Sequence, residues 1–190
     1  MSSVAETAAA LEAGHLVVLP TDTVYGLACR PDREDAVRAL SATKGRSPAQ
    51  PIALVGTSAD ALLELVPELR SALLVPGPFT LVVGNPARRL PWLTGDRPDT
   101  IGVRVPELRG AALRIVTRVG AVGATSANVH GGPDPTRVEE IPAEIRAAAV
   151  VVDGGELPGT PSTVVDLTGG EPKILREGAV PAAEVLERLA

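Results

Sequence analysis

Short apolar runs alternate with segments of helical periodicity along the whole chain, and this alternation constrains the fold more than any other feature. Runs such as 16–20, 79–85 and 100–106 have the length of strands. Segments such as 32–45 and 107–120 carry apolar residues on one helical face. Because such a pattern is typical of helices that cover a mixed sheet, we expect a mixed α/β (α+β) fold.

Capping residues and helix breakers mark the ends of the expected elements. Ser3 and Glu6 have the spacing of a capping box, and Gly14 ends the first helix. Asp32 is expected to cap the second helix, which ends at Gly45. The other expected elements are strands at 24–29, 51–56, 121–126, 150–155, 162–168 and 173–178, two short helices in 58–74 broken near Pro67, and helices at 139–149 and 180–190.

Composition limits the class of protein. The 190 residues contain no linker-like segment, so we expect one domain, 1–190, whose core is aliphatic because Tyr25, Phe79 and Trp92 are the only aromatic residues. The net charge of -5 argues against a broad nucleic-acid surface but allows a local basic pocket. The single Cys29 excludes an internal disulfide and a cysteine zinc site.

Several familiar signals are absent from the sequence. The first twenty residues include acids and no long apolar run, so we expect neither a signal peptide nor a membrane span, and a cytoplasmic location with no membrane partner. Gly45 follows Lys44 instead of preceding it, which excludes a P-loop, and no GxSxG motif is present. His15 and His130 have no metal-ligating neighbours.

Polar residues at the ends of apolar strands are the candidate ligand-binding groups. They occur at Thr21–Thr23, at Ser126 and Asn128, and at Ser162. Hydroxyls at such positions suit a small polar ligand, although the same residues are common in ordinary turns.

Arg104 is a candidate of a different kind. In the strand at 100–106, Ile101, Val103 and Val105 share one face, whereas Gly102 and Arg104 share the other. A guanidinium beside a glycine has room to bind a carboxylate, and a solvent-facing arginine is an equally good interpretation.

Three further cations have alternative interpretations. Lys44 and Arg46 precede an apolar strand and suit a phosphate chain, but cations near a helix C-terminus also complement its dipole. Arg176, near the end of a strand, is by local pattern an ordinary surface charge.

Taken in order, the segments "PTDTVYGL", "KGR…PI", "VRVP", "TSAN…G…PT", "STVVDL" and "ILREG" closely resemble the YrdC-like family of threonylcarbamoyl-AMP synthases. The resemblance extends from about Leu16 to Gly178. It implies a YrdC/RibB-like three-layer fold, in which helices flank a twisted mixed sheet around a concave cleft. We expect the short, single-domain form.

The resemblance also implies an activity. The family is a group of nucleotidyltransferases that condense L-threonine, bicarbonate or CO2 and ATP into threonylcarbamoyl-AMP and pyrophosphate. Partner transferase machinery then modifies an adenosine of tRNA, so tRNA is met indirectly. Mg²⁺ is expected to enter with ATP, with no metal site made by protein alone. The threonine amine would take up CO2, and the carbamate would attack the α-phosphorus without a protein nucleophile.

Site residues follow from the matching motif positions. Those expected to bind ATP are Lys44, Arg46, Thr100, Ser126, Asn128 and Arg176, with Lys44 and Arg46 on the phosphates as the catalytic pair. Those expected to bind L-threonine are Thr21, Arg104 and Ser162, with Arg104 on the carboxylate. Because Lys44 and Arg46 stand in a loop-like stretch, replacing either with alanine is expected to abolish adenylate formation and spare the fold.

Two residues depart from the family pattern. His130 replaces a small residue, and Asp134 stands where serine is common; we leave this acid out of the site because it would repel triphosphate. Two other functions stay open: a family paralogue of uncertain activity, and an RNA-binding module that uses the basic cleft. The related domain of hydrogenase-maturation carbamoyltransferases occurs with zinc-finger cysteines, which Cys29 alone cannot supply.

Overall fold

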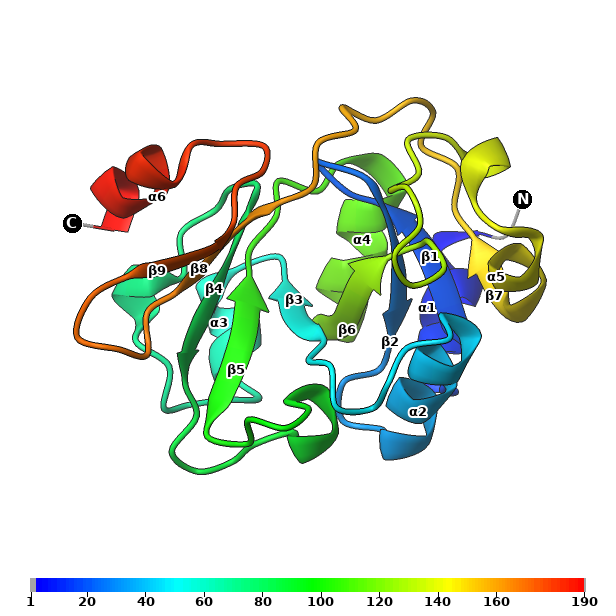
Figure 1. Ribbon diagram of the computed structural model, residues 1–190. Coiled ribbons are helices and arrows are strands. Elements are labelled where there is room, and N and C mark those ends of the chain that lie inside the picture. Colours follow the sequence, from blue (N-terminus) through cyan, green and yellow to red (C-terminus); the bar gives the residue numbers. More distant parts are fainter. Residues whose placement is uncertain (1–2, 190) are drawn as a thin grey trace.

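A computed structural model describes residues 3–189, which form one sheet of nine strands flanked by helices (Figure 1). The strands are β1 (Leu16–Pro20), β2 (Tyr25–Cys29), β3 (Ala53–Gly56), β4 (Phe79–Gly84), β5 (Thr100–Arg104), β6 (Ala121–Ser126), β7 (Ala149–Val151), β8 (Thr163–Asp166) and β9 (Lys173–Arg176). The α-helices are α1 (Val4–Glu12), α2 (Glu34–Thr43), α3 (Ala59–Leu63), α4 (Gly110–Val119), α5 (Ala143–Ala148) and α6 (Ala182–Leu189). Residues 1, 2 and 190 of the expected domain and of the expected last helix lie outside the described residues.

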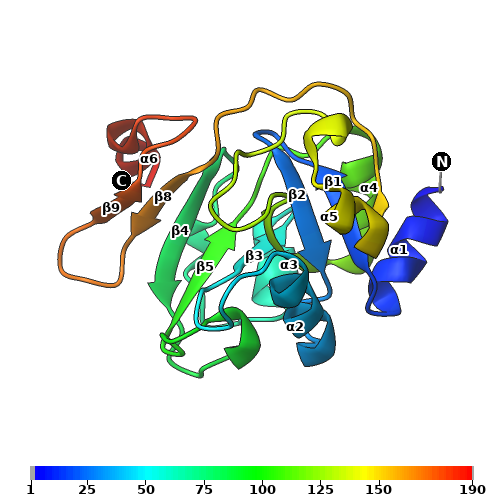
Figure 2. The ribbon, with the colours of Figure 1, turned by 45° about the vertical axis from the view of Figure 1, so that its right-hand side comes forward.

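The sheet is mixed, as expected. Its strand order is β7-β1-β2-β6-β3-β5-β4-β8-β9. The pairs β1 with β7, β3 with β5, and β4 with β8 are parallel, and the other five pairs are antiparallel. Its two edge strands are β7 and β9. Figure 2 shows the twist of this sheet from a second direction.

Helices cover both faces of the half of the sheet that contains β1. Leu16 and Val18 point into the core shared with α2 and α5, while Val17 and Leu19 point into the core shared with α1 and α4. The alternation follows from the two-residue period of a strand. This half is therefore a three-layer sandwich.

The other half of the sheet is covered on one face only. In β5, Ile101 and Val103, followed by Val105, are buried in the core, as their alternation predicts. Gly102 and Arg104 face the opposite way, into an open cavity. The face that α4 covers over the first half thus continues uncovered across β5, β4 and β8, and this uncovered face forms the wall of the site described below.

Two expected helix boundaries are wrong. Asp32 does not cap α2, which begins after Arg33 without a side-chain cap; Asp32 instead accepts hydrogen bonds from Arg30 at 2.9 and 2.6 Å. The second helix expected after Pro67 is only a short 3-10 turn at Ser71–Leu73.

Three further elements start or stop later or earlier than expected. The helix α4 begins at Gly110 and not at position 107, because its N-cap Arg109 is still extended. Pro142 separates a 3-10 turn at Val138–Glu140 from α5, so the expected 139–149 helix is divided. The strand β7 ends at Val151, and residues 152–161 run as an irregular segment towards β8.

Gly95 lies at a close contact between the loop that precedes β5 and the 46–51 loop, both of which line the cavity. Its φ is +59°, and a Cβ added there would lie 2.1 Å from the carbonyl oxygen of Ala49. The neighbouring amide of Asp96 donates to the same oxygen at 3.1 Å.

We expect Gly95→Ala to lower the free energy of unfolding by about 2–3 kcal/mol, because the added methyl forces the 46–51 loop away and also strains the backbone. Urea denaturation measures this change. The matched control is Gly84→Ala, because a Cβ at Gly84 meets nothing within 4 Å. Equal stability of the two variants would contradict the conclusion that the contact between Gly95 and the 46–51 loop has no room for a side chain.

Within the described part of the chain, every helix is too short or too polar to cross a membrane.

Candidate active site

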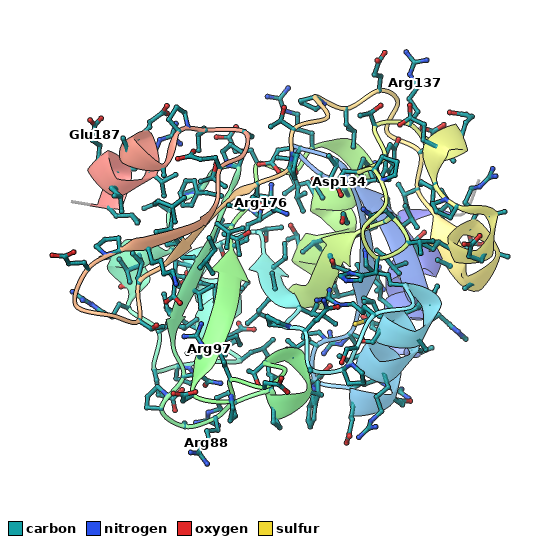
Figure 3. The ribbon with its side chains drawn as sticks, viewed as in Figure 1. Arg88, Arg97, Asp134, Arg137, Arg176 and Glu187 are labelled. Atoms are coloured by element: carbon teal, nitrogen blue, oxygen red, sulfur yellow. The ribbon has the colours of Figure 1, made fainter. Side chains whose placement is uncertain are left out.

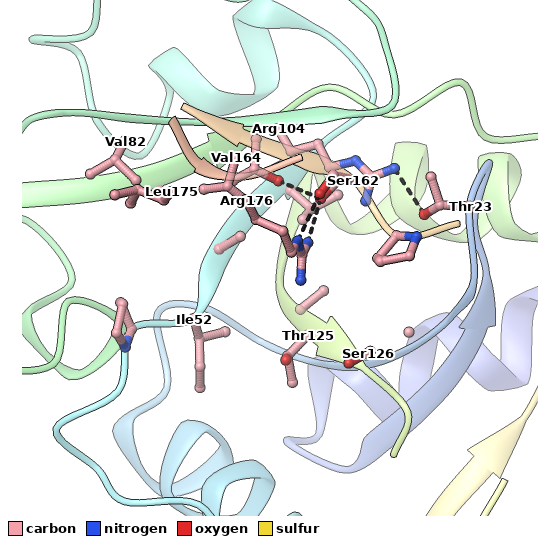
Figure 4. Close-up of a pocket in the computed structure, with 18 of the residues that line it drawn as sticks. Thr23, Ile52, Val82, Arg104, Thr125, Ser126, Ser162, Val164, Leu175 and Arg176 are labelled. Carbon is pink, nitrogen blue, oxygen red and sulfur yellow. Dashed lines mark hydrogen bonds between the residues drawn. The ribbon is translucent and has the colours of Figure 1, made fainter. Parts of the chain in front are cut away.

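A cavity of about 470 Å³ lies against the uncovered face of the sheet. Its walls come from β3, β4, β5, β6, β8 and β9 and from the loops that follow β1 and α2 (Figure 4). Its charged lining residues are Arg46, Asp96, Arg97, Arg104 and Arg176. Four guanidinium groups and one carboxylate make this cavity attractive to an anion.

Arg104 occupies the end of the cavity nearest the loop that follows β1. Its Nη2 donates to Asp22 Oδ1 and, at 3.1 Å, to Thr23 Oγ1. Asp22 Oδ2 in turn accepts from the Glu107 amide at 3.1 Å, so the pair is held from both sides. The Nε of Arg104 is buried and has no hydrogen-bond partner among the described residues. Burial lowers the pKa of Arg104, Asp22 raises it, and Arg176 lowers it.

Ser162 and Arg176 stand beside Arg104 in the same wall (Figure 4). Arg176 donates from Nε to the Ser162 carbonyl at 3.0 Å and from Nη2 to its hydroxyl at 3.1 Å. The Ser162 hydroxyl also lies 3.1 Å from Thr80 Oγ1. These bonds fix the arginine through neutral oxygens and leave its charge free for a ligand.

Arg46 reaches the cavity from the opposite side. It donates to Thr125 Oγ1 at 3.3 Å and to the Pro51 carbonyl at 2.9 Å, again to neutral oxygens. Its Nε is buried and unpartnered within residues 3–189, and burial lowers the pKa of its guanidinium. Arg46 and Arg104 therefore each offer a buried N–H donor without a protein acceptor, which is the feature expected where a ligand supplies the acceptor.

Lys44 lies in the turn that follows α2, as expected, but it is buried, so the expectation that its replacement spares the fold is corrected. It is the C-cap of α2, its residue is 3% exposed, and it is not among the residues that line the cavity. Its Nζ donates to the Ser126 carbonyl at 2.5 Å and to Asn128 Oδ1 at 2.6 Å. Gly45 follows this C-cap, its φ of +63° suits a glycine, and the turn directs Lys44 inward. In this structure Lys44 holds the segment that carries Ser126.

Asn128 and Asp134 complete the same network. Asn128 Oδ1 accepts from Lys44 and, at 2.8 Å, from the Ser126 hydroxyl. Its Nδ2 donates to the Gly132 carbonyl at 2.7 Å and to Asp134 Oδ1 at 3.1 Å. Asp134 is thus occupied by Asn128 and does not line the cavity. Both polar atoms of the Asn128 side chain are thus engaged in hydrogen bonds within the protein.

His130 ties this loop to the loop that contains Arg46. Its backbone N–H donates to the Lys44 carbonyl at 3.0 Å, and its Nε2 lies 3.2 Å from Gln50 Nε2. The two loops therefore form one continuous edge of the site.

Two of the expected threonine and nucleotide residues already have local hydrogen bonds. Thr21 Oγ1 donates to the Val24 carbonyl at 2.7 Å and lines the cavity from the turn after β1. Thr100 Oγ1 donates to the Arg97 carbonyl at 3.1 Å at the start of β5.

The structure brings most of the expected site residues together. The cavity is lined by Thr21, Arg46, Thr100, Ser126, Arg104, Ser162 and Arg176, whereas Lys44 and Asn128 lie directly behind Ser126. The roles assigned to these residues stay predictions.

Sequence reasoning missed two groups at the site. Asp22 stands in the polar turn after β1, and nothing in its local sequence indicates that it pairs with Arg104, which is 82 positions away. Arg97 stands in the turn "GDRPDT", where the local pattern shows only a polar turn. Both roles depend on contacts between distant segments.

A second hollow, of about 660 Å³, lies on the other side of Thr21 and Asp22. Its charged residues are largely occupied: Glu156 pairs with Arg137 at 2.6 Å, and Arg188 pairs with Glu184 at 2.6 Å. Although it is the larger space, acidic side chains outnumber basic ones in its lining, which makes it less attractive to an anion than the first cavity. We therefore place the site in the first cavity.

Comparison with known proteins identifies the family of the chain. The family model of Sua5, YciO and YrdC proteins, described as "Telomere recombination", matches residues 9–178. The chain belongs to the Sua5/YciO/YrdC family. A Mycobacterium tuberculosis relative is 37% identical over 188 residues, which cover 95% of this chain and 86% of that protein. The threonylcarbamoyl-AMP synthase of Chromohalobacter salexigens is 33% identical over 176 residues, which cover 88% of this Sua5/YciO/YrdC chain and 94% of that protein.

A solved structure shares the fold. The crystal structure of Pyrococcus abyssi Sua5 complexed with L-threonine superposes with a TM-score of 0.86 at 32% identity, covering 97% of this chain and 56% of that one. The YrdC-like fold expected from the sequence motifs is confirmed.

Proposed function

We propose that this protein is an L-threonylcarbamoyladenylate synthase, a nucleotidyltransferase that condenses L-threonine, bicarbonate or CO2 and ATP with release of pyrophosphate. The observation that carries the proposal is the single cavity in which Arg46 and Arg176, held only by neutral oxygens, converge with Arg104, which is oriented by Asp22. Relatives of this family that span most of the chain are named threonylcarbamoyl-AMP synthase.

The amino acid is assigned to the Arg104 end of the cavity. The unpartnered Nε of Arg104 would donate to the threonine carboxylate, while Asp22 and Thr23 hold the guanidinium in place. Ser162 and Thr21 supply hydroxyls on the two sides of this end. An ion pair that is already formed before binding lowers the ordering cost of substrate recognition.

The nucleotide is assigned to the remaining space. Its phosphates would lie beside Ser126 and between Arg46 and Arg176, whose guanidinium groups can form charge-assisted hydrogen bonds. Its base would extend into the apolar part of the cavity, which Val82 and Val164 line. In this arrangement the α-phosphorus lies next to the amino acid, as the reaction requires.

The chemistry needs positioning and charge stabilisation. The neutral threonine amine attacks CO2 and loses a proton, which gives a carbamate. A carbamate oxygen then attacks the α-phosphorus in line, the bond to the bridging oxygen breaks, and pyrophosphate leaves. Arg46 and Arg176 would stabilise the charge that develops on the phosphate oxygens.

Mg²⁺ is proposed to enter with ATP. Asp96 is the acidic side chain among the described residues that line the cavity, so the donor set fits a metal held mainly by phosphate oxygens and water. When bound, Mg²⁺ would supply positive charge to the phosphates. The partner transferase, the indirect link to tRNA and a cytoplasmic location are likewise proposals that follow from the family.

The pH dependence of the reaction is expected to report on Lys44. Burial lowers its pKa to about 8, the neighbouring Arg46 contributes in the same direction, and Asp134 opposes them. We expect kcat/KM for ATP to fall as pH rises through about 8, because the charge that holds the Ser126 segment is lost. A pH–rate profile of the protein, with Lys44→Met as the comparison, measures this; a flat profile to pH 9.5 would argue against it.

The same shift has a consequence for stability, with the opposite sign. Lysine in an unfolded chain titrates near about 10.4, so between the two pKa values the unfolded chain binds more protons than the folded one. The charged Lys44 therefore destabilises the folded state at pH values below about 8. This cost decreases as the pH rises from about 8 towards about 10.4.

Isotope labelling tests the proposed reaction. The protein is incubated with ATP, L-threonine and ¹³C-bicarbonate, and the products are analysed by mass spectrometry. We expect threonylcarbamoyl-AMP that carries one ¹³C atom. Tight, salt-dependent RNA binding without this product would favour the RNA-binding module instead, and neither result would favour a paralogue with another substrate.

A further inference from the structure

Arg97 lines the cavity at the end opposite to Arg104. It precedes β5, and the first residue of that strand, Thr100, donates its amide to the Arg97 carbonyl at 3.0 Å. Arg104 is the last residue of β5. The rise of a strand separates these two ends by about 13 Å. Figure 3 shows Arg97 near the start of β5 and Arg176 at the other end of the site.

The guanidinium of Arg97 is held by two acceptors from the end of β8. Its Nη1 donates to Asp166 Oδ2 at 3.0 Å, and its Nη2 donates to Thr168 Oγ1 at 3.2 Å. The side chain of Asp166 is 10% exposed, and its other oxygen accepts from the Thr168 amide at 2.9 Å. The plane of the guanidinium is therefore fixed, and much of its charge is neutralised by Asp166. Such a guanidinium binds a phosphate weakly but offers a planar surface on which an aromatic ring can stack.

The surroundings of Arg97 in the cavity are apolar. Val82 and Val164 line this part, together with Leu175. The register of β9 skips Leu175, because Val164 pairs with Arg176 and Val165 pairs with Ile174. This bulge brings Leu175 and Arg176, which are consecutive residues, into the same cavity. Figure 4 shows Val82 and Leu175 on one side of Ser162 and Thr23 on the other.

We propose that Arg97 contacts the nucleobase of ATP, with its guanidinium plane, oriented by Asp166, packed on the adenine ring. The inference rests on the proposed function, because the α-phosphorus must lie beside the carbamate near Arg104, so that the base extends along β5 towards Arg97. A purine matches both the apolar side chains and the fixed planar cation at this end.

Two ligands separate a contact to the base from a contact to phosphate. Binding of ATP and of inorganic tripolyphosphate is measured by calorimetry for the unmodified protein, for Arg97→Ala and for Arg88→Ala. Arg88 is the matched control because it is exposed, lies in the same β4–β5 connection and does not line the cavity. We expect Arg97→Ala to weaken ATP binding about 10-fold, to leave tripolyphosphate binding within about two-fold, and Arg88→Ala to change neither.

Equal weakening of both ligands by Arg97→Ala would make Arg97 a phosphate ligand and would overturn the inference, as would unchanged ATP binding. Absence of ATP binding by the unmodified protein would overturn the proposed function as well. Asp166→Asn provides a second measurement. If Asp166 acts by orienting Arg97, the single variant Asp166→Asn binds ATP more weakly, but the double variant Asp166→Asn with Arg97→Ala binds ATP no more weakly than Arg97→Ala. Additive losses in the double variant would contradict this positioning role.

Discussion

Arg104→Ala is expected to raise the KM for L-threonine about 100-fold while the KM for ATP stays within about two-fold. A charge-assisted hydrogen bond from the buried Nε to a carboxylate contributes up to about 3 kcal/mol, which corresponds to this factor. The guanidinium lies at the cavity end that we assign to the amino acid and has a buried donor without a protein acceptor. Steady-state kinetics with each substrate varied in turn measure both constants.

The same substitution leaves the Asp22 carboxylate without its cation. Since removal of one partner of a buried pair costs about 3–5 kcal/mol, Arg104→Ala alone could lose stability as well as affinity. The double variant Arg104→Ala with Asp22→Asn removes the uncompensated charge, and we expect it to fold and to keep the high threonine KM. Arg118→Ala, an exposed site in the last turn of α4, is the control. An unchanged threonine KM in a folded Arg104 variant would remove this residue from the amino-acid pocket.

Lys44→Met is expected to lower kcat/KM for ATP by at least about 100-fold. The substitution keeps the length of the side chain but removes the two hydrogen bonds to the Ser126 carbonyl and Asn128 Oδ1. The segment that presents Ser126 to the cavity then loses its buried anchor. Kinetics with ATP varied at saturating threonine measure the loss.

A stability measurement separates this effect from that of Arg46. We expect Lys44→Met to lower the free energy of unfolding by about 1–3 kcal/mol, because two buried acceptors lose a hydrogen-bond donor. Arg46→Ala should reduce ATP affinity with a smaller change in stability, since its hydrogen bonds lie at the cavity surface. The matched control is Lys173→Met, at an exposed position of β9. Full ATP-dependent activity of the Lys44 variant would contradict the anchoring role.

The faces of the strands could be predicted because they depend on local alternation. The separation of Gly102 and Arg104 from Ile101 and Val103 follows from the two-residue period alone. The structure confirms which face is buried. The pattern does not show whether Arg104 faces solvent or a cavity. The answer depends on α1 and α4, which cover this face only over the half of the sheet that contains β1.

The buried position of Lys44 could not be predicted from its neighbours. Next to Gly45 at the end of a helix, a lysine is normally solvated. Here its acceptors belong to Ser126 and Asn128, which are 82 and 84 positions away. The helix start at Asp32 failed for a related reason, since Arg30 competes for the carboxylate that would have capped α2.

The central claim is that one cavity binds the amino acid and the nucleotide side by side and joins them. Pyrophosphate release from ATP, measured in the presence of bicarbonate with and without L-threonine, tests it most directly. We expect release to require L-threonine and to be lost in Arg46→Ala. Release at the same rate without the amino acid, or none in its presence, would contradict the claim.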